Sequence, residues 1–204
     1  MAEFTAQDVQ ALRQATGAGM MDAKKALTET GGDMDKAKDY LREQGMAAVA
    51  KRADRSQGEG VVGVYMHNQA GRPVIGVLVG LASETDFVAK SDDFIAAAND
   101  IAMHAAAARP SWINREDVPE EVLEKEKSLI AAQARNEGKP DEIVDRIVEG
   151  RIGSFYKEHV LVDQVFVRSD RFEGTVGELV QQMAVRMGEN ISVVSMARVE
   201  IGEN

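Results

Sequence analysis

Two runs rich in β-branched residues constrain the fold of this chain most, because they interrupt a pattern that is otherwise helical. The runs span 61–67 and 74–82, and they flank a segment at 68–73 that contains glycine and proline. Runs of this kind on either side of a turn segment are typical of a β-hairpin. We therefore expect two paired strands with a turn of several residues between them.

A third alternating segment lies near the end of the chain, at 191–201. Its apolar residues are expected to share one face of a single strand: Ile191, Val193, Ala197, Val199 and Ile201. Strands and helices do not alternate along the chain as a doubly wound parallel sheet would require. We therefore expect an α+β fold, in which a small antiparallel sheet is packed with helices.

Residues 5–52 carry apolar side chains at helical spacing, interrupted by glycines, and this pattern predicts three short helices. The inward-facing residues should be Val9, Leu12 and Ala15, then Met20, Ala23 and Leu27, and finally Met34, Ala37 and Leu41. The polar, glycine-containing segment 55–60 indicates a linker. We therefore divide the chain into a three-helix module at 1–54 and an α+β core at 55–204.

Start and stop signals predict four further helices in the core. Prolines at 110, 119 and 140 mark where helices end or begin, and Ser91 can start the first of them. Thr175 and Glu178 form the pattern of a capping box before the last helix. The stretch 158–174 is expected to be irregular.

The charge balance argues against nucleic acid as a direct partner. The chain has 24 Lys and Arg against 34 Asp and Glu, a net charge of −10, and its densest basic stretch is short. Binding a phosphate backbone requires clustered basic side chains. No signal-peptide pattern begins the sequence, and its longest apolar run is far shorter than the roughly 20 residues of a membrane helix. We expect a cytoplasmic protein without membrane or nucleic-acid contacts.

No motif in the sequence carries the chemistry of an enzyme. The pattern G-x-G-x-x-G at 58–63 precedes a predicted strand instead of following one, so a linker explains it better than a dinucleotide site. His67, His104 and His159 lack metal-ligand spacing, and the chain has no cysteine. We therefore expect no catalytic residue, no metal site and no cofactor.

The junction between the hairpin and the next helix places a phenylalanine among charged neighbours. Thr85 or Asp86 can cap a short turn, and Phe87 follows directly. This ring either packs back on the sheet or projects as a wedge, the kind of anchor found at protein–protein hot spots. Met20 and Met21 pose the same question, because adjacent side chains on a helix cannot both face one core.

Two stretches, 12–27 and 84–89, resemble the signature sequences of the elongation factor Ts family. The resemblance implies a ubiquitin-associated-like module at the N-terminus, followed by an α+β core. It also implies a guanine-nucleotide exchange factor that binds elongation factor Tu in its GDP-bound and nucleotide-free states. Such a factor promotes release of GDP, so that GTP can bind. A plain adaptor or scaffold protein is the alternative.

The resemblance also implies roles for residues of this sequence. The segment that displaces Mg²⁺ from the partner would be Thr85, Asp86, Phe87 and Val88, with Phe87 as the wedge. Contacts with the GTPase domain of elongation factor Tu would come from Arg13, Met20 and Met21. A further partner contact would come from His104.

The chain departs from the family pattern in its length. Longer members carry a duplicated core subdomain, whereas this sequence has a single copy. Short members are homodimers, so the resemblance implies a homodimer here, in which the second subunit stands in for the missing half. Smaller departures, at Ala23 and at 82–83, lie outside the wedge.

Overall fold

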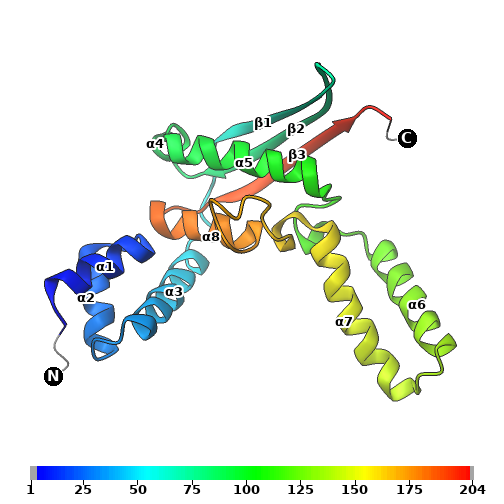
Figure 1. The fold of residues 1–204 in the computed structure, drawn as a ribbon, viewed down its shortest axis with the longest axis horizontal. Helices are drawn as coiled ribbons and strands as arrows, with labels where there is room; N and C mark the ends of the chain where they lie inside the picture. The colour runs from blue at the N-terminus through cyan, green and yellow to red at the C-terminus, as the bar shows by residue number, and fades with distance from the viewer. Residues whose placement is uncertain (1–3, 203–204) are drawn as a thin grey trace.

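The computed structural model describes residues 4–202. Its elements in chain order are α1 (Ala6–Thr16), α2 (Met20–Glu29), α3 (Met34–Ala50), β1 (Glu59–Gln69), β2 (Arg72–Ser83), α4 (Asp86–Ala89), α5 (Asp92–Ala108), α6 (Glu120–Asn136), α7 (Asp141–His159), α8 (Val176–Met187) and β3 (Ser192–Glu200). Three helices precede a three-stranded antiparallel sheet packed with helices, which confirms the α+β class (Figure 1). Among residues 4–202, no helix has the length and apolar character that crossing a membrane requires.

The hairpin of β1 and β2 forms where the β-branched runs predict it, but its turn is tighter than expected. The strands pair as far as Gln69 opposite Arg72, so only Ala70 and Gly71 connect them. Both connecting residues have positive φ, 51° and 80°, as a tight two-residue hairpin turn requires. The segment expected to be a loop therefore belongs largely to the two strands.

Strand β3 pairs antiparallel with β2, so the sheet order is β1-β2-β3. The ladder between them contains a bulge at Val194. Val193 lies opposite Leu81 and Ser195 lies opposite Gly80, so the residue between them has no partner on β2. An unpaired residue of this kind reverses the alternation of faces beyond it.

The expectation of a single apolar face along 191–201 is therefore wrong. Ile191 and Val193 are buried before the bulge, whereas Ala197, Val199 and Ile201 are exposed beyond it. Alternation in a sequence is counted residue by residue, so it cannot reveal a position that the ladder skips. The exposed residues join a second apolar surface, on the outer face of the sheet.

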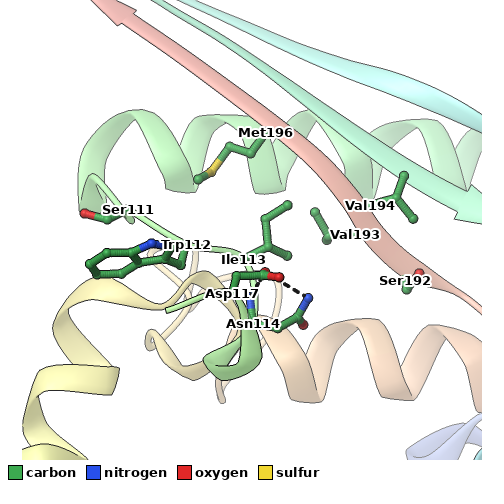
Figure 2. A pocket seen from close by; sticks show the side chains of 9 residues that line it. All are labelled: Ser111, Trp112, Ile113, Asn114, Asp117, Ser192, Val193, Val194 and Met196. Carbon is green, nitrogen blue, oxygen red and sulfur yellow. Dashed lines mark hydrogen bonds between the residues drawn. The ribbon is translucent and has the colours of Figure 1, made fainter. Parts of the chain in front are cut away.

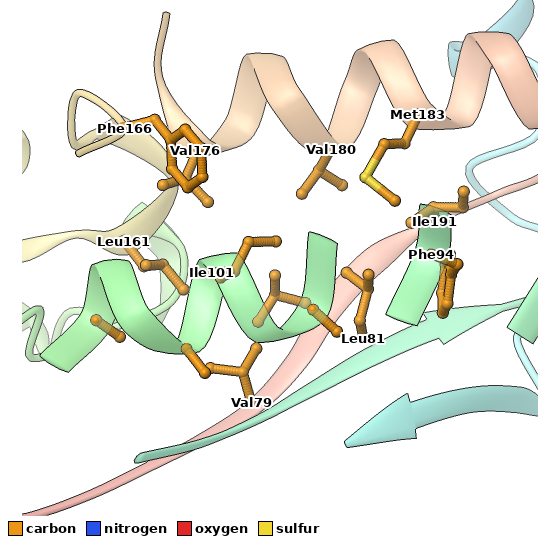
Figure 3. Packing of buried hydrophobic residues seen from close by; sticks show 14 of the residues in the cluster. Val79, Leu81, Phe94, Ile101, Leu161, Phe166, Val176, Val180, Met183 and Ile191 are labelled. Carbon is orange, nitrogen blue, oxygen red and sulfur yellow. The ribbon is translucent and has the colours of Figure 1, made fainter. Parts of the chain in front are cut away.

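The main core lies on the inner face of the sheet, where α5 is packed between the strands and α8 (Figure 3). Its buried side chains include Phe94 and Ile101 from α5, Val79 and Leu81 from β2, and Val180 and Met183 from α8. Helix α8 begins with the expected capping box, in which Thr175 and Glu178 each bond the backbone N–H of the other. These two bonds satisfy backbone N–H groups at the start of α8.

Helices α1 to α3 have a small core of their own. Its buried members are Val9, Leu12, Ala23, Ala26, Leu27 and Ala37. Ala15 and Met20, which were expected to face inward, are exposed instead, because helices this short bury only a narrow stripe. The separate core favours the division near residue 54, which stays a prediction.

Helix α3 connects this three-helix unit to the main core through α8. Gly45 of α3 lies against Val185 of α8, and a Cβ at this glycine would lie 2.9 Å from Cγ2 of the valine. The missing side chain therefore lets the two helices approach closely. Helices α6 and α7 instead pack against each other and extend away from the sheet (Figure 1).

The stretch after α7 is as irregular as expected, although α7 itself continues to His159. A short 3-10 helix at Leu161–Asp163 and an isolated bridge between Val165 and Thr175 are its main regular features. This stretch covers the end of α5 and leads into α8.

Candidate functional site

The one-turn helix α4 follows β2 and carries the segment that the sequence marks as a wedge. Thr85 is its N-cap, and the Thr85 hydroxyl oxygen accepts a hydrogen bond of 3.4 Å from the N–H of Val88. Val88 and Ala89 are buried, which fixes how the turn is rotated about its axis. Phe87 is consequently turned outward, with 83% of its surface exposed. Of the two arrangements left open by the sequence, the structure has the projecting ring.

Asp86, next to the projecting ring, forms an ion pair with Lys90, with 2.5 Å between the carboxylate and the ammonium group. Their hydrogen bond lowers the pKa of Asp86 and raises the pKa of Lys90. Both side chains are exposed, so the pair adds little to stability. The wedge therefore presents a phenyl ring flanked by a pair of opposite charges.

The turn that leads into α4 is held by two residues that follow α8. The Glu189 carboxylate accepts hydrogen bonds from the backbone N–H groups of Glu84 and Thr85, at 3.0 and 3.1 Å. In return, the Asn190 N–H donates to the carboxylate of Glu84 at 2.6 Å, and this bond lowers the pKa of Glu84. The wedge is therefore anchored to a segment from a distant part of the chain.

A hollow of about 470 Å³ opens beside Phe87, between the start of α5 and the end of α8. It is lined by Phe87, Val88, Ser91, Asp92, Asp93, Arg186, Met187 and Glu189. The Arg186 guanidinium pairs with the Asp93 carboxylate at 2.7 Å. Aromatic rings, methionine and arginine are enriched at protein interfaces, so this surface suits a protein partner.

The three residues expected to contact a GTPase domain lie at one end of the N-terminal unit. Arg13 is in the last turn of α1, and Met20 and Met21 begin α2 on the other side of a short turn. All three are exposed, Met21 by 74%. A Cβ on Gly17, within this turn, would lie 3.8 Å from Cδ of Arg186. The turn therefore adjoins the hollow beside the wedge.

A second hollow, of about 530 Å³, lies between β3 and the segment after α5 (Figure 2). Its lining residues are Ser111, Trp112, Ile113, Asn114, Asp117, Ser192, Val193, Val194 and Met196. The carboxylate among them, Asp117, accepts hydrogen bonds from the backbone and side chain of Asn114. No group of three or more potential metal ligands gathers anywhere in residues 4–202. This hollow adds no catalytic candidate.

The similarity to known proteins extends over the whole chain. A family model described as "Elongation factor TS" matches residues 2–203. The chain belongs to the elongation factor Ts family. Its relatives include the elongation factor Ts of Desulforamulus reducens, which is 51% identical over 203 residues covering 100% of this chain and 91% of the relative. The proteins of Moorella thermoacetica and Thermoanaerobacter pseudethanolicus are 50% and 53% identical over 200 residues, covering 98% of this chain and 96% of each relative.

Elongation factor Ts is the nucleotide exchange factor for elongation factor Tu, so the predicted function is confirmed. As a member of this family, the chain is a cytoplasmic translation factor of protein biosynthesis and an exchange factor rather than an enzyme. The family assignment replaces the adaptor or scaffold alternative.

His104 lies inside this elongation factor Ts fold and not on its surface. The side chain is fully buried in α5. Its Nδ1 accepts a hydrogen bond of 3.2 Å from the Val167 N–H, so the proton is on Nε2, which donates to the Gln164 side-chain oxygen at 2.9 Å. Both ring nitrogens are thus used within the chain. This burial gives His104 a structural role and leaves its ring no free face for a partner.

Protonation of His104 should make the stability of the protein depend on pH. Burial lowers the pKa of this imidazole below its ordinary value of 6.5, whereas the unfolded chain titrates near 6.5. Below that value the unfolded state binds more protons than the folded state. The free energy of unfolding should therefore decrease as the pH is lowered, by up to about 1.4 kcal/mol per pH unit. The free energy of unfolding should stop decreasing once the pH lies below the pKa of His104 in the folded protein.

Urea unfolding from about pH 8 to about pH 5 measures this slope. The variant His104→Gln should show a smaller slope over the same range, whatever its absolute stability. His67→Gln, at an exposed position of β1, is the matched control for the loss of one histidine. Equal slopes for His104→Gln and the parent would contradict the prediction.

Glu189 is the residue of this site to which the sequence patterns assign no role. The family match covers this position together with the rest of residues 2–203. A similarity of this kind marks a segment but does not say what a carboxylate within it contacts. Its partners, Glu84 and Thr85, are 105 and 104 positions away, so no local spacing could have shown them.

Proposed function

We propose that Thr85, Asp86, Phe87 and Val88 form the segment that displaces Mg²⁺ from the nucleotide site of elongation factor Tu. The observation that carries this proposal is the exposed ring of Phe87 on a turn whose neighbours Val88 and Ala89 are buried. A projecting aromatic side chain on a fixed turn can enter a crevice of a partner with little loss of conformational entropy.

Shifting a single ligand is enough to release Mg²⁺, because of the way proteins bind this ion. Mg²⁺ demands near-ideal octahedral geometry, keeps several water ligands and is held by one or two protein groups together with the phosphates. A side chain that shifts one of these groups removes much of the binding energy of the ion. The exchange factor then needs no reactive group of its own.

Linkage sets the energy that the interface must supply. If the factor binds the nucleotide-free partner more tightly than the GDP-bound partner, it lowers the affinity of the partner for GDP by the same ratio. Burying one phenylalanine is worth about 1.5–3 kcal/mol. Phe87 can therefore account for roughly a 10- to 100-fold share of that ratio.

We further propose that Arg13, Met20 and Met21 contact the GTPase domain of elongation factor Tu, as part of a ubiquitin-associated-like module. Two exposed methionines provide a surface that adapts to a partner, because their side chains are flexible and polarizable. Their turn adjoins Arg186 at the hollow beside Phe87. Both contact surfaces can therefore engage one partner at the same time.

Release of fluorescent GDP from elongation factor Tu, with and without this chain, tests the role of Mg²⁺. We expect a large acceleration in excess Mg²⁺ and a much smaller one after chelation by EDTA, because the ion that the wedge displaces is then already absent. The matched control is the intrinsic release rate under both conditions. Equal acceleration with and without Mg²⁺ would refute displacement of the ion and leave the exchange function intact.

A second copy of this chain is the partner that we propose for the outer face of the sheet. Val64 of β1 lies opposite Leu78 of β2, which lies opposite Ala197 of β3. The next row on this face joins Met66 and Val199 across Gly76. These positions carry no charge, and all except the half-buried Gly76 are exposed, although the chain as a whole has a net charge of −10.

The lack of charge on this face is what favours self-association. Two copies with a net charge of −10 each repel one another, so a stable contact requires a surface without like charges. A twofold axis places the same patch of each copy against the other, and flat apolar sheets pack face to face in this way. Exposed contiguous apolar patches are typical of such interfaces.

A further inference from the structure

Three hydrogen bonds converge on one carboxylate behind the wedge. Gly188 caps the end of α8, and its φ of 73° turns the chain back toward β2. One oxygen of Glu189 then accepts the backbone N–H groups of Glu84 and Thr85, at 3.0 and 3.1 Å, and the other accepts the Thr85 hydroxyl at 2.5 Å. Hydrogen bonds to an ionised acceptor are shorter and stronger than neutral ones.

We infer that Glu189 is a positioning residue for Phe87, which it orients through Thr85 without touching the partner's nucleotide site. This inference rests on the wedge role proposed above for Phe87. Glu189 lies outside the signature segment at 84–89, so the residues that take part in nucleotide exchange would include one that follows α8.

The Thr85 side chain transmits the orientation. Its hydroxyl donates to Glu189 and, with the same oxygen, accepts the N–H of Val88 as the N-cap of α4. The carboxylate therefore selects the rotamer of Thr85 that starts the helix. Helix α4 has only four residues, and so short a helix does not hold itself in water. Without Glu189, the buried Val88 and Ala89 would still turn Phe87 outward, but the start of α4 would be held less firmly and the ring would sample a wider range of directions.

The neighbouring residue extends the same anchor to the linker. The Asn190 side-chain amide donates to the backbone carbonyls of Ala53 and Arg55, at 3.1 and 3.0 Å. The Arg55 guanidinium in turn contacts the carboxylate of Glu84 at 3.3 Å. Glu189 and Asn190 thus hold both the wedge and the linker that leads to the N-terminal unit.

The physical consequence is preorganisation. A wedge that samples several directions is competent for only a fraction of the time, and the apparent affinity for the partner falls by that fraction. Once bound, the partner orders the ring again. Loss of Glu189 should therefore raise the factor concentration that gives half-maximal GDP release, whereas loss of the Phe87 ring should lower the maximal rate.

Exchange kinetics with the full chain and elongation factor Tu·GDP separate these effects. We expect Glu189→Ala to raise the half-maximal concentration about tenfold, the equivalent of one charge-assisted hydrogen bond, with the maximal rate within about twofold of the parent. Glu189→Gln retains an acceptor for the two N–H groups and should recover most of the loss. Glu173→Ala, at an exposed carboxylate ahead of α8, is the matched control and should behave as the parent.

Amide hydrogen exchange at Glu84 and Thr85 provides a readout that does not depend on activity. We expect faster exchange at both amides in Glu189→Ala and near-parental exchange in Glu189→Gln. Thr85→Val, which removes only the hydroxyl, should also raise the half-maximal concentration. This variant tests the inference if Glu189→Ala fails to fold. Unchanged half-maximal concentrations in Glu189→Ala, or in Thr85→Val in that case, would overturn the inference. If Phe87→Ala also leaves GDP release unchanged, the wedge proposal itself fails. Separately, unaltered hydrogen exchange at the Glu84 and Thr85 amides in Glu189→Ala would show that Glu189 does not anchor the turn.

Discussion

Phe87→Ala should lower the maximal rate of GDP release from elongation factor Tu by about 10- to 100-fold. The ring is exposed in the free protein, so its removal leaves the fold intact and deletes only what it would bury in the partner. That burial is worth about 1.5–3 kcal/mol, and each 1.4 kcal/mol is a factor of ten. Stopped-flow release of fluorescent GDP over a range of factor concentrations measures the effect.

Graded and remote variants sharpen this result. Phe87→Leu keeps an apolar side chain of smaller size and should lie between alanine and the parent. Val165→Ala removes an apolar side chain that is 73% exposed at a different surface and should leave release unchanged. A Phe87→Ala protein as active as the parent, at every concentration, would remove Phe87 from the mechanism.

Val64→Glu should dissociate the homodimer that we propose. The substitution puts a carboxylate in the middle of the uncharged outer face, and the twofold axis brings two such groups into one interface. Burying an unpaired charge costs at least about 2 kcal/mol per copy, which raises the dissociation constant on the order of 1,000-fold. Light scattering at micromolar concentration should change from twice 22.1 kDa to 22.1 kDa.

Ile95→Glu is the control for this experiment, because Ile95 is an exposed apolar residue of α5 and not of the sheet. It should remain dimeric. A parent protein that already sediments as a single copy at these concentrations would refute the dimer. A Val64→Glu protein that stays dimeric would place the interface elsewhere.

The order of elements could be predicted from the sequence because each signal is local. The β-branched runs of the hairpin and the capping pattern of Thr175 and Glu178 report on residues that are neighbours in the chain. The tight turn at Ala70 could not be predicted, because a non-glycine residue with positive φ is uncommon. The bulge in β3 was equally hidden, since it depends on how β3 pairs with β2 and not on β3 alone.

The wedge could be found from the sequence, but its direction could not. Whether Phe87 projects depends on which neighbours are buried, and Val88 and Ala89 decide that only once α5 and the sheet are packed. His104 is the opposite case, a residue expected to contact a partner that is instead buried. Family resemblance favoured a partner contact, whereas the irregular stretch that carries Gln164 and Val167 folds over the ring. Long-range packing determines both outcomes.

The bulge at Val194 has a consequence for how this family can change over evolutionary time. Because Val194 has no partner on β2, its deletion would shorten β3 to a regular ladder and leave every other side chain on its present face. A deletion of Met196 that kept the bulge would instead shift Ala197 and Val199 by one position and turn them toward the inner core. Length variation among descendants of this chain should therefore accumulate at the bulge, where one codon can be lost without disturbing the inner core or the outer face.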